Sequence, residues 1–504
     1  MGKASRIKKL RKITVQEKIK DLQPKRWIKD NQWQLIGLVL LVIAAYGNSL
    51  DNAFVSDDIY AIVNDPELNS WSFIGKNWLN FIQPFVYVLI TKVFGKVPFY
   101  FHLVNLSGHI LAVTAAYLLI ELLINKRVAF LASLLLAVHP LSTEAVTWIS
   151  GGPYSWHAGF LLLSLWGLVK ATQGEKKFYV FSCLSFLISL QTFNRSLVMV
   201  GIAVILLWVL GQLRKNWKLL IAPTVMALIY VRKIFSRTPD QFNGLVNNYN
   251  NHASFTNPLI QIPIAITEYF KLILWPINLT LYHSELFYTK VGYLVSLGVF
   301  LLFMAALGYT AVKKRMVFFW LMFFVIVLSP TLTPFGFGWI VAERYAYLAS
   351  LGIYAVVGMG ISRLMTKKGW EKTVIAIVAI AIILLFIRTL VRNRDWQDQD
   401  HLWLAAERTS PSSQQNHNNL GDLYSRRGDL KQAEWHFKKA IEINPSYADA
   451  MHNLANTYVM MGKFEEAIKW YEDALKNKPS LWQSQRQLEA VKEHLKSVTK
   501  DGSL

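Results

Sequence analysis

The chain has 504 residues, of which 53% are hydrophobic, and a formal net charge of +21 at pH 7. The length is too great for one ordinary domain, and the single cysteine excludes an intramolecular disulfide. The charge does not indicate nucleic-acid binding, because eleven Lys or Arg residues fall in the first thirty positions and most other basic clusters lie between apolar runs. This long basic start, with no small-residue cleavage site after the first apolar run, also argues against a cleavable signal peptide.

Apolar runs up to residue 392 predict about eleven membrane spans. Basic residues collect at the cytoplasmic ends of spans, so the basic start places the N-terminus in the cytoplasm, and an odd number of spans leaves the C-terminal part outside. The predicted spans are residues 33–49, 102–124, 128–147, 155–172, 178–193, 197–213, 219–235, 291–312, 318–332, 346–364 and 373–391. Between them we expect a helix along the outer surface at 83–94, a polar loop at 236–256, a short helical run at 263–275 and a Pro-Gly turn at 334–338.

The last hundred residues repeat with a period of 34, the period of a tetratricopeptide helix pair. Seven positions recur at this offset: Leu420, Tyr424, Gly428, Ala433, Phe437, Ala440 and Pro445 match Leu454, Tyr458, Gly462, Ala467, Tyr471, Ala474 and Pro479. Trp403, Ala406 and Pro411 match the second helix of a partial repeat, and Leu488 begins a closing helix through Lys496. Such an array can bury a continuous core and bind a peptide or protein in its concave face, although a purely structural cap is the alternative.

These patterns predict an all-α protein in three parts. Residues 1–32 form a basic cytoplasmic segment, residues 33–392 a multi-spanning membrane domain, and residues 393–500 a tetratricopeptide-repeat α-solenoid. The predicted location is therefore an integral membrane, with the repeats outside. The compact loops and the short repeat array favour a prokaryotic plasma membrane; in a eukaryote the same topology would place the repeats in the lumen of the endoplasmic reticulum.

Five acids and no base occupy the segment from Asp51 to Asn69, just after the first predicted span. Ionised groups are costly near hydrocarbon, so acids at this place suggest a function. We predict that the adjacent Asp57 and Asp58 are catalytic. Asp57 would take the proton of an acceptor hydroxyl, and Asp58 would position it, contact the acceptor or help to bind a divalent metal ion. A solvated loop or a helix cap is the alternative.

Five further side chains near predicted outer ends are expected to bind the donor phosphate or sugar: His139, Glu144, Arg195, Glu343 and Arg344. The guanidinium of Arg344 offers paired donors to phosphate oxygens, and Arg195 is a second candidate. Arg344 could instead pair with Glu343 or extend to the membrane interface. Glu144 could bind sugar hydroxyls, orient a basic residue or form a buried structural pair.

Several short motifs resemble those of the membrane glycosyltransferases with C-terminal tetratricopeptide repeats, which are relatives of protein O-mannosyltransferases. They are Phe54–Asp58 with Asn64, Phe101–Asn105 with His109, His139-Pro140, Thr143–Val146 with Trp148–Ser150, Glu343–Leu348 with Ser350–Gly352, and Arg392-Asn393 with Asp395-Trp396. The chain departs from the family at four places, namely Gln83-Pro84, Ser142, Gly152 and Asn194-Arg195. The resemblance implies a GT-C fold, a polyprenyl-phosphate sugar donor, and catalysis on the outer or lumenal face by the acidic pair in the first outer loop.

Three functions remain open from the sequence. The first is a glycosyltransferase that moves a sugar, mannose by the resemblance, from a polyprenyl phosphate to Ser or Thr hydroxyls of proteins held by the repeats. The second keeps the donor but transfers to a glycan or lipid, as in envelope polysaccharide assembly. The third is a non-catalytic membrane scaffold whose repeats recruit proteins.

Overall fold

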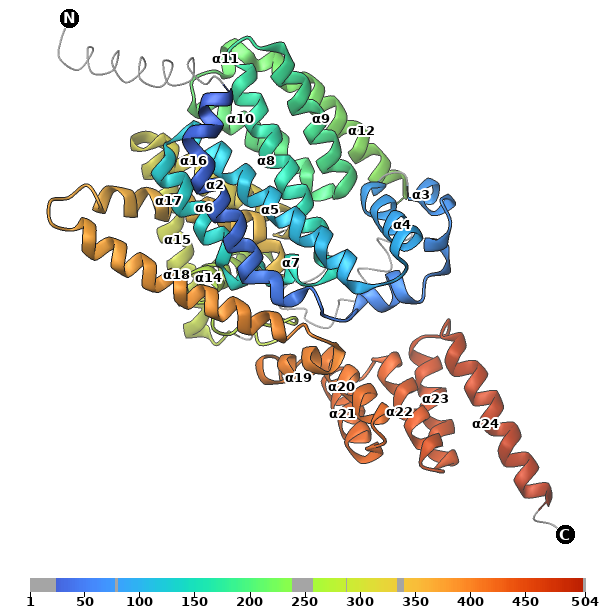
Figure 1. The fold of residues 1–504 in the computed structure, drawn as a ribbon. Coiled ribbons are helices and arrows are strands. Elements are labelled where there is room, and N and C mark those ends of the chain that lie inside the picture. The colour runs from blue at the N-terminus through green and yellow to red at the C-terminus, as the bar shows by residue number, and fades with distance from the viewer. Residues whose placement is uncertain (1–23, 78–79, 238–256, 287, 333–339, 502–504) are drawn as a thin grey trace, which may run out of the picture. The chain divides into compact units, whose positions relative to one another are not determined.

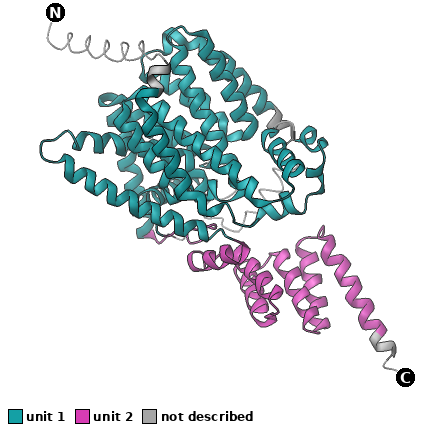
Figure 2. Ribbon diagram, in the orientation of Figure 1, with its two compact units in different colours: residues 1–277, 291–397 teal, residues 278–290, 398–504 magenta. Residues whose placement is uncertain are grey.

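The computed structural model describes residues 24–77, 80–237, 257–286, 288–332 and 340–501, and all regular elements within them are helices (Figure 1). Most of the predicted basic segment, most of the polar loop at 236–256 and the Pro-Gly turn at 334–338 lie outside these residues. The chain divides into two compact units (Figure 2). Unit 1 comprises residues 1–277 and 291–397, and unit 2 comprises residues 278–290 and 398–504.

Unit 1 is a helical bundle. Its helices are α2 (Pro24–Tyr46), α3 (Ser72–Lys76), α4 (Ile82–Phe94), α5 (Pro98–Leu123), α6 (Lys126–Val138), α7 (Thr143–Val146), α8 (Pro153–Ala171), α9 (Lys176–Thr192), α10 (Met199–Val209), α11 (Leu213–Asn216), α12 (Ile221–Arg237), α14 (Pro258–Leu274), α15 (Lys290–Lys313), α16 (Arg315–Leu328), α17 (Glu343–Leu364) and α18 (Glu371–Arg394). Short 3-10 and π-helical turns join several of them.

Each predicted span overlaps at least one of these helices, but the count of about eleven spans is not confirmed. Among the described residues, five helices are long and apolar enough to cross a membrane: Lys29–Ser49, Pro98–Leu123, Lys290–Lys313, Glu343–Met365 and Glu371–Arg394. A sixth is obtained if the bent pair Lys126–Val138 and Pro140–Val146 is one span. These helices indicate a membrane protein.

The third predicted span, residues 128–147, is not one straight helix in the structure. The helix stops at Val138, and the next helical segment is inclined to it by 57°. Pro140 is the cause: a proline disfavours helical backbone at the residue before it, and His139 accordingly has extended backbone with ψ at 128°. The break separates α7 from α6 and directs Glu144 toward the site described below.

The centre of unit 1 is built from α5, α6, α8 and α17, which pack closely against one another (Figure 1). Glycines permit two close approaches in unit 1, one between α5 and α8 and one between α17 and α16. A side chain at Gly108 would meet the ring of Trp156, and one at Gly352 would come within 2.4 Å of the backbone oxygen of Trp320 on α16. By contrast, α15 and α18 bury little of their surface against the rest of the protein, so most of their apolar side chains are available to lipid.

Unit 2 contains the predicted repeats. Its helices are α19 (Gln399–Thr409), α20 (Gln414–Arg426), α21 (Leu430–Ile443), α22 (Ala448–Met460), α23 (Phe464–Asn477) and α24 (Trp482–Asp501). The repeated apolar positions form the core, in which Phe437, Leu454 and Tyr471 are almost fully buried. Gly428 and Gly462, one period apart, both have positive φ in the turns between paired helices, a conformation that favours glycine.

Unit 2 also includes residues 278–290, which the chain inserts between α14 and α15. The ring of Tyr282 stacks on that of Trp403 with 6.4 Å between centroids, and its hydroxyl accepts a hydrogen bond of 3.1 Å from the Asn419 side chain. The Glu285 carboxylate accepts a 2.7 Å hydrogen bond from the backbone N–H of Ser412. The start of the repeat array therefore binds a non-helical segment of its own chain.

Candidate active site

The two adjacent acids after α2 have different surroundings. Asp58 is fully buried, and its Oδ1 accepts hydrogen bonds from Ser150 N at 2.8 Å and Ser150 Oγ at 2.5 Å. Its Oδ2 accepts from the backbone N–H of Val55 at 3.2 Å. The side chain of Asp57 is exposed. Asp57 is thus open to a substrate, whereas Asp58 holds the loop to the segment that begins α8.

Backbone conformation reinforces this division. Ser56, immediately before the acidic pair, has a φ of 54°, in the left-handed region that side chains other than glycine seldom adopt. Such a conformation persists only where the surroundings enforce it, and it is found preferentially at functional sites. Here the hydrogen bonds of Asp58 to Val55 and Ser150 close the loop around Ser56 and fix the direction of Asp57.

Both acids have raised pKa values. Burial raises the pKa of Asp58 to about 7, although its hydrogen bonds from Ser150 and Val55 act in the opposite direction. Surrounding protein also raises the pKa of Asp57, even though its side chain has access to solvent, while the positive charge of Arg344 lowers it. The charge of Arg344 therefore influences the pKa of Asp57, and Asp57 is a stronger base than an ordinary aspartate.

Arg344, the second residue of α17, is held by Glu144. The Arg344 guanidinium donates to Glu144 Oε1, and its backbone N–H donates to Glu144 Oε2 at 2.8 Å. The exposed fraction is 12% for the Arg344 side chain and 1% for Glu144. Two of the roles predicted for Glu144 fit this geometry, namely the orientation of a basic residue and a buried structural pair.

A second cation lies beside the first. The Arg195 guanidinium stands 3.9 Å from the ring centroid of Tyr345, and that of Arg344 stands 5.0 Å from the same ring. Arg195 also contacts the ring of Tyr154 at 5.3 Å. Within the described part of the chain, no carboxylate lies within 4 Å of Arg195. Its charge is therefore not neutralised by a carboxylate of the described residues, and two guanidinium groups meet at the ring of Tyr345.

Glu343 has a different partner from the one its position suggests. Its Oε1 accepts a 3.0 Å hydrogen bond from Arg392 near the end of α18, and Arg392 also pairs with Asp395 at 3.0 Å. Asn393, which follows Arg392, accepts a hydrogen bond from Thr147 and donates one to the backbone oxygen of Ala45. This buried network joins the end of α18 to α17, and Glu343 is placed to support the site rather than to line it.

The structure does not bring His139 together with the other candidates. Its Nε2 lies 2.9 Å from the backbone oxygen of Ile273, and its Nδ1 accepts a hydrogen bond from the N–H of Leu141. Both ring nitrogens are thus engaged where α6 ends. In the described residues, no group of three or more His, Cys, Asp or Glu side chains is arranged to hold a metal ion.

Sequence reasoning assigned no role to Ser150 or Tyr345, which the structure places at the centre of the site. Ser150 binds Asp58 across 92 residues of sequence, and no local pattern signals such a contact. Tyr345 follows Glu343-Arg344 in a motif already noted for its resemblance, but its position between two guanidinium groups depends on the packing of α17 against the turn after α9.

Comparison with known proteins gives one family-model match, to the tetratricopeptide repeat, over residues 415–480. Protein O-mannosyl-transferase TMTC3 of Mus musculus is 24% identical over 514 residues, which cover 88% of this chain and 54% of that protein. Human protein O-mannosyl-transferase TMTC1 is 24% identical over 519 residues, which cover 81% of this chain and 55% of that protein. The chain thus spans about half the length of these relatives. The resemblance inferred from the motifs is confirmed.

Two solved structures are also similar. ArnT from Cupriavidus metallidurans, bound to undecaprenyl phosphate, aligns with a TM-score of 0.43 and 13% identity, covering 88% of this chain and 80% of that one. The archaeal oligosaccharyltransferase AglB from Archaeoglobus fulgidus, in complex with an inhibitory peptide and a dolichol-phosphate, aligns with a TM-score of 0.42 and 13% identity, covering 74% of this chain and 56% of that one.

Proposed function

We propose that this chain is an integral-membrane glycosyltransferase that moves mannose from a polyprenyl phosphate to Ser or Thr hydroxyls of proteins. One arrangement carries the proposal: the exposed carboxylate of Asp57 is under the electrostatic influence of Arg344, and Arg344 and Arg195 flank the same tyrosine ring. A base and two cations at one place are what this transfer requires. The names of the similar proteins support the protein acceptor and the sugar.

The proposed reaction is a single displacement with inversion. The acceptor oxygen forms a bond to C1 of the sugar while the bond from C1 to the phosphate oxygen breaks, and the phosphate keeps the electron pair. Asp57 takes the proton of the acceptor hydroxyl, and its raised pKa makes it the better acceptor of that proton. Arg344 and Arg195 stabilise the negative charge that gathers on the departing phosphate.

The remaining predicted residues act indirectly in this proposal. Glu144 fixes the guanidinium of Arg344 from one side and leaves its other donors for phosphate oxygens. Asp58, which is buried, is a positioning residue for Asp57. The predicted topology places this end of unit 1 on the outer or lumenal face, with the N-terminus in the cytoplasm.

We assign binding of the acceptor protein to the repeats of unit 2. The supporting observation is that α19 and α20 already bind a non-helical segment, by aromatic stacking on Trp403 and by a hydrogen bond from Asn419. Solenoids of helix pairs offer such contacts along a continuous face, so a second segment can be bound further along α22 and α24.

Transfer by the purified full chain tests the proposal. Wild type and Asp57→Asn are offered a panel of polyprenyl-phosphate sugars and a protein extract, with Asp51→Asn as the matched control because Asp51 is an exposed acid of the same segment. Label should move to protein in wild type and in the control, and fall about 10²–10⁴-fold in Asp57→Asn. Label that moves to glycan or lipid would instead support a glycosyltransferase of envelope polysaccharide assembly. No transfer by folded wild type with any donor would favour a scaffold.

A further inference from the structure

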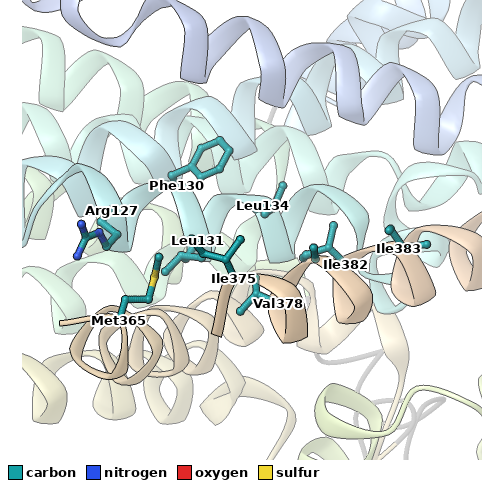
Figure 3. Close-up of a pocket in the computed structure, with 10 residues that line it drawn as sticks. Arg127, Phe130, Leu131, Leu134, Met365, Ile375, Val378, Ile382 and Ile383 are labelled. Carbon is teal, nitrogen blue, oxygen red and sulfur yellow. The ribbon is translucent and has the colours of Figure 1, made fainter. Parts of the chain in front are cut away.

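An apolar cavity of about 430 Å³ lies between α6 and α18, close to the end of α17 (Figure 3). Nine of its ten lining side chains are apolar, and the tenth is Arg127. Figure 3 shows Arg127 and Met365 at one end of the cavity and Ile383 at the other. The cavity is therefore an elongated apolar channel with a cation at one end.

This cavity is distinct from the candidate active site. Arg127 is in the first turn of α6, whereas the other end of α6 leads to the break before Glu144. At 1.5 Å per residue, the eleven residues from Arg127 to Val138 separate the two ends by roughly 16 Å. The direction of α18 agrees, because its start lines the cavity and its end, at Arg392, pairs with Glu343.

The cationic end of the cavity is reinforced by the turn that joins α17 to α18. This turn follows Met365 directly and carries Lys367 and Lys368, and the first turn of α18 adds Lys372 beside one acid, Glu371. Arg127 is exposed, and among the described residues no carboxylate forms an ion pair with it. An anionic group at this end would therefore meet several positive charges and little opposing charge.

We propose that this cavity is a binding site for an anionic glycerophospholipid. One acyl chain lies between α6 and α18, and the phosphate meets Arg127 and the basic turn. The small share of α18 that is buried leaves the cavity accessible from the lipid phase, and apolar walls exclude a soluble anion from the channel itself. Basic pockets between membrane helices bind anionic head groups in this way. The predicted topology places this end in the cytoplasmic leaflet, which is the leaflet rich in such lipids.

The test is lipid binding by the full chain, measured by native mass spectrometry after transfer from mixed micelles of phosphatidylcholine and phosphatidylglycerol. Wild type should retain phosphatidylglycerol in preference to phosphatidylcholine. Arg127→Gln should reduce this preference about fivefold, since one cation near a membrane surface contributes on the order of 1 kcal/mol. The matched control is Lys176→Gln, which removes an exposed cation from the start of α9, away from the cavity.

A second variant tests the channel itself. Ala379 lines the cavity, so Ala379→Trp should fill it and abolish the bound phosphatidylglycerol while far-UV circular dichroism shows unchanged helix content. Equal retention of both lipids by wild type, or retention of phosphatidylglycerol by Ala379→Trp, would overturn the proposal. Displacement of the lipid by glycerophosphate alone would assign the cationic end to a soluble anion. A lipid-free dimer that Ala379→Trp abolishes would assign the cavity to a second copy of the chain.

Discussion

Glu144 binds Arg344 through both of its carboxylate oxygens, although 200 residues separate the two in sequence. One oxygen meets the guanidinium, and the other meets the backbone N–H at the start of α17. The contact fixes the side chain and the helix start together. It exists because Pro140 breaks the preceding helix and lets α7 turn toward α17. In the proposed reaction, this pair sets the direction from which Arg344 meets the donor phosphate.

Glu144→Gln should weaken use of the donor rather than the chemistry of the acceptor. The amide retains an acceptor oxygen but loses the charge that orients the guanidinium, and a hydrogen bond to a charged group is worth about 1.5–3 kcal/mol. We expect kcat/KM for the polyprenyl-phosphate sugar to fall about 10–150-fold, with a smaller change in the KM for the acceptor. Glu67→Gln, which breaks an exposed ion pair with Lys76, is the control and should leave both constants unchanged. Equal losses for donor and acceptor would argue against the assignment.

The pH dependence of transfer should report the electrostatic influence of Arg344 on Asp57. A general base must be deprotonated, so the rate falls as the pH drops through its pKa, and the raised pKa of Asp57 places this acidic limb above the ordinary Asp value of about 3.9. The charge of Arg344 lowers that pKa, so Arg344→Gln should move the limb to higher pH, whereas Arg344→Lys should hold it near the wild-type position.

A limb due to Asp58 would behave differently in the same profiles. Its pKa of about 7 depends on burial, on Ser150 and Val55, and on the charge of Asp57. It should therefore stay in place when Arg344 is replaced. An acidic limb that is identical in wild type and Arg344→Gln would remove the support for Asp57 as the base.

The sequence was sufficient for the helices and the repeats, because both depend on local periodicity. Apolar runs located the helices of unit 1, and the period of 34 residues located the helix pairs of unit 2. The ion pairs could not be predicted in the same way. Glu343 and Arg344 are adjacent, but neighbours on a helix project in different directions, and each pairs with a distant residue instead. The bend at His139–Pro140 carried a signal, the proline, which hydrophobicity alone obscured.

The buried pair of Glu343 and Arg392 should be more important for stability than for catalysis. Both side chains are almost fully buried, so removing one partner weakens the compensation of the other charge, although Asp395 still pairs with Arg392. Breaking a buried ion pair typically costs about 3–5 kcal/mol. Glu343→Gln and Arg392→Gln should each lower the Tm of the purified protein. The double variant should recover part of the loss, because it removes both charges of the pair. Additive losses in the double variant would show that the two residues act independently.

The segment inserted into unit 2 should stabilise the start of the repeat array. Tyr282→Ala removes the ring stacked on Trp403 and the hydroxyl that accepts from Asn419, whereas Tyr282→Phe removes only the hydroxyl. An aromatic pair contributes about 0.5–1.5 kcal/mol beyond its buried area, and a neutral hydrogen bond about 1 kcal/mol. Tyr282→Ala should therefore destabilise the contact of this segment with unit 2 more than Tyr282→Phe does. We expect trypsin to cut the full chain faster after Lys290, where the segment ends and α15 begins, in the order Tyr282→Ala, Tyr282→Phe, wild type. His283→Ala, which leaves the stacked ring in place, provides the comparison for a change within the same segment. Cleavage at one rate in all four proteins would mean that the contacts with Trp403 and Asn419 do not hold this segment in solution.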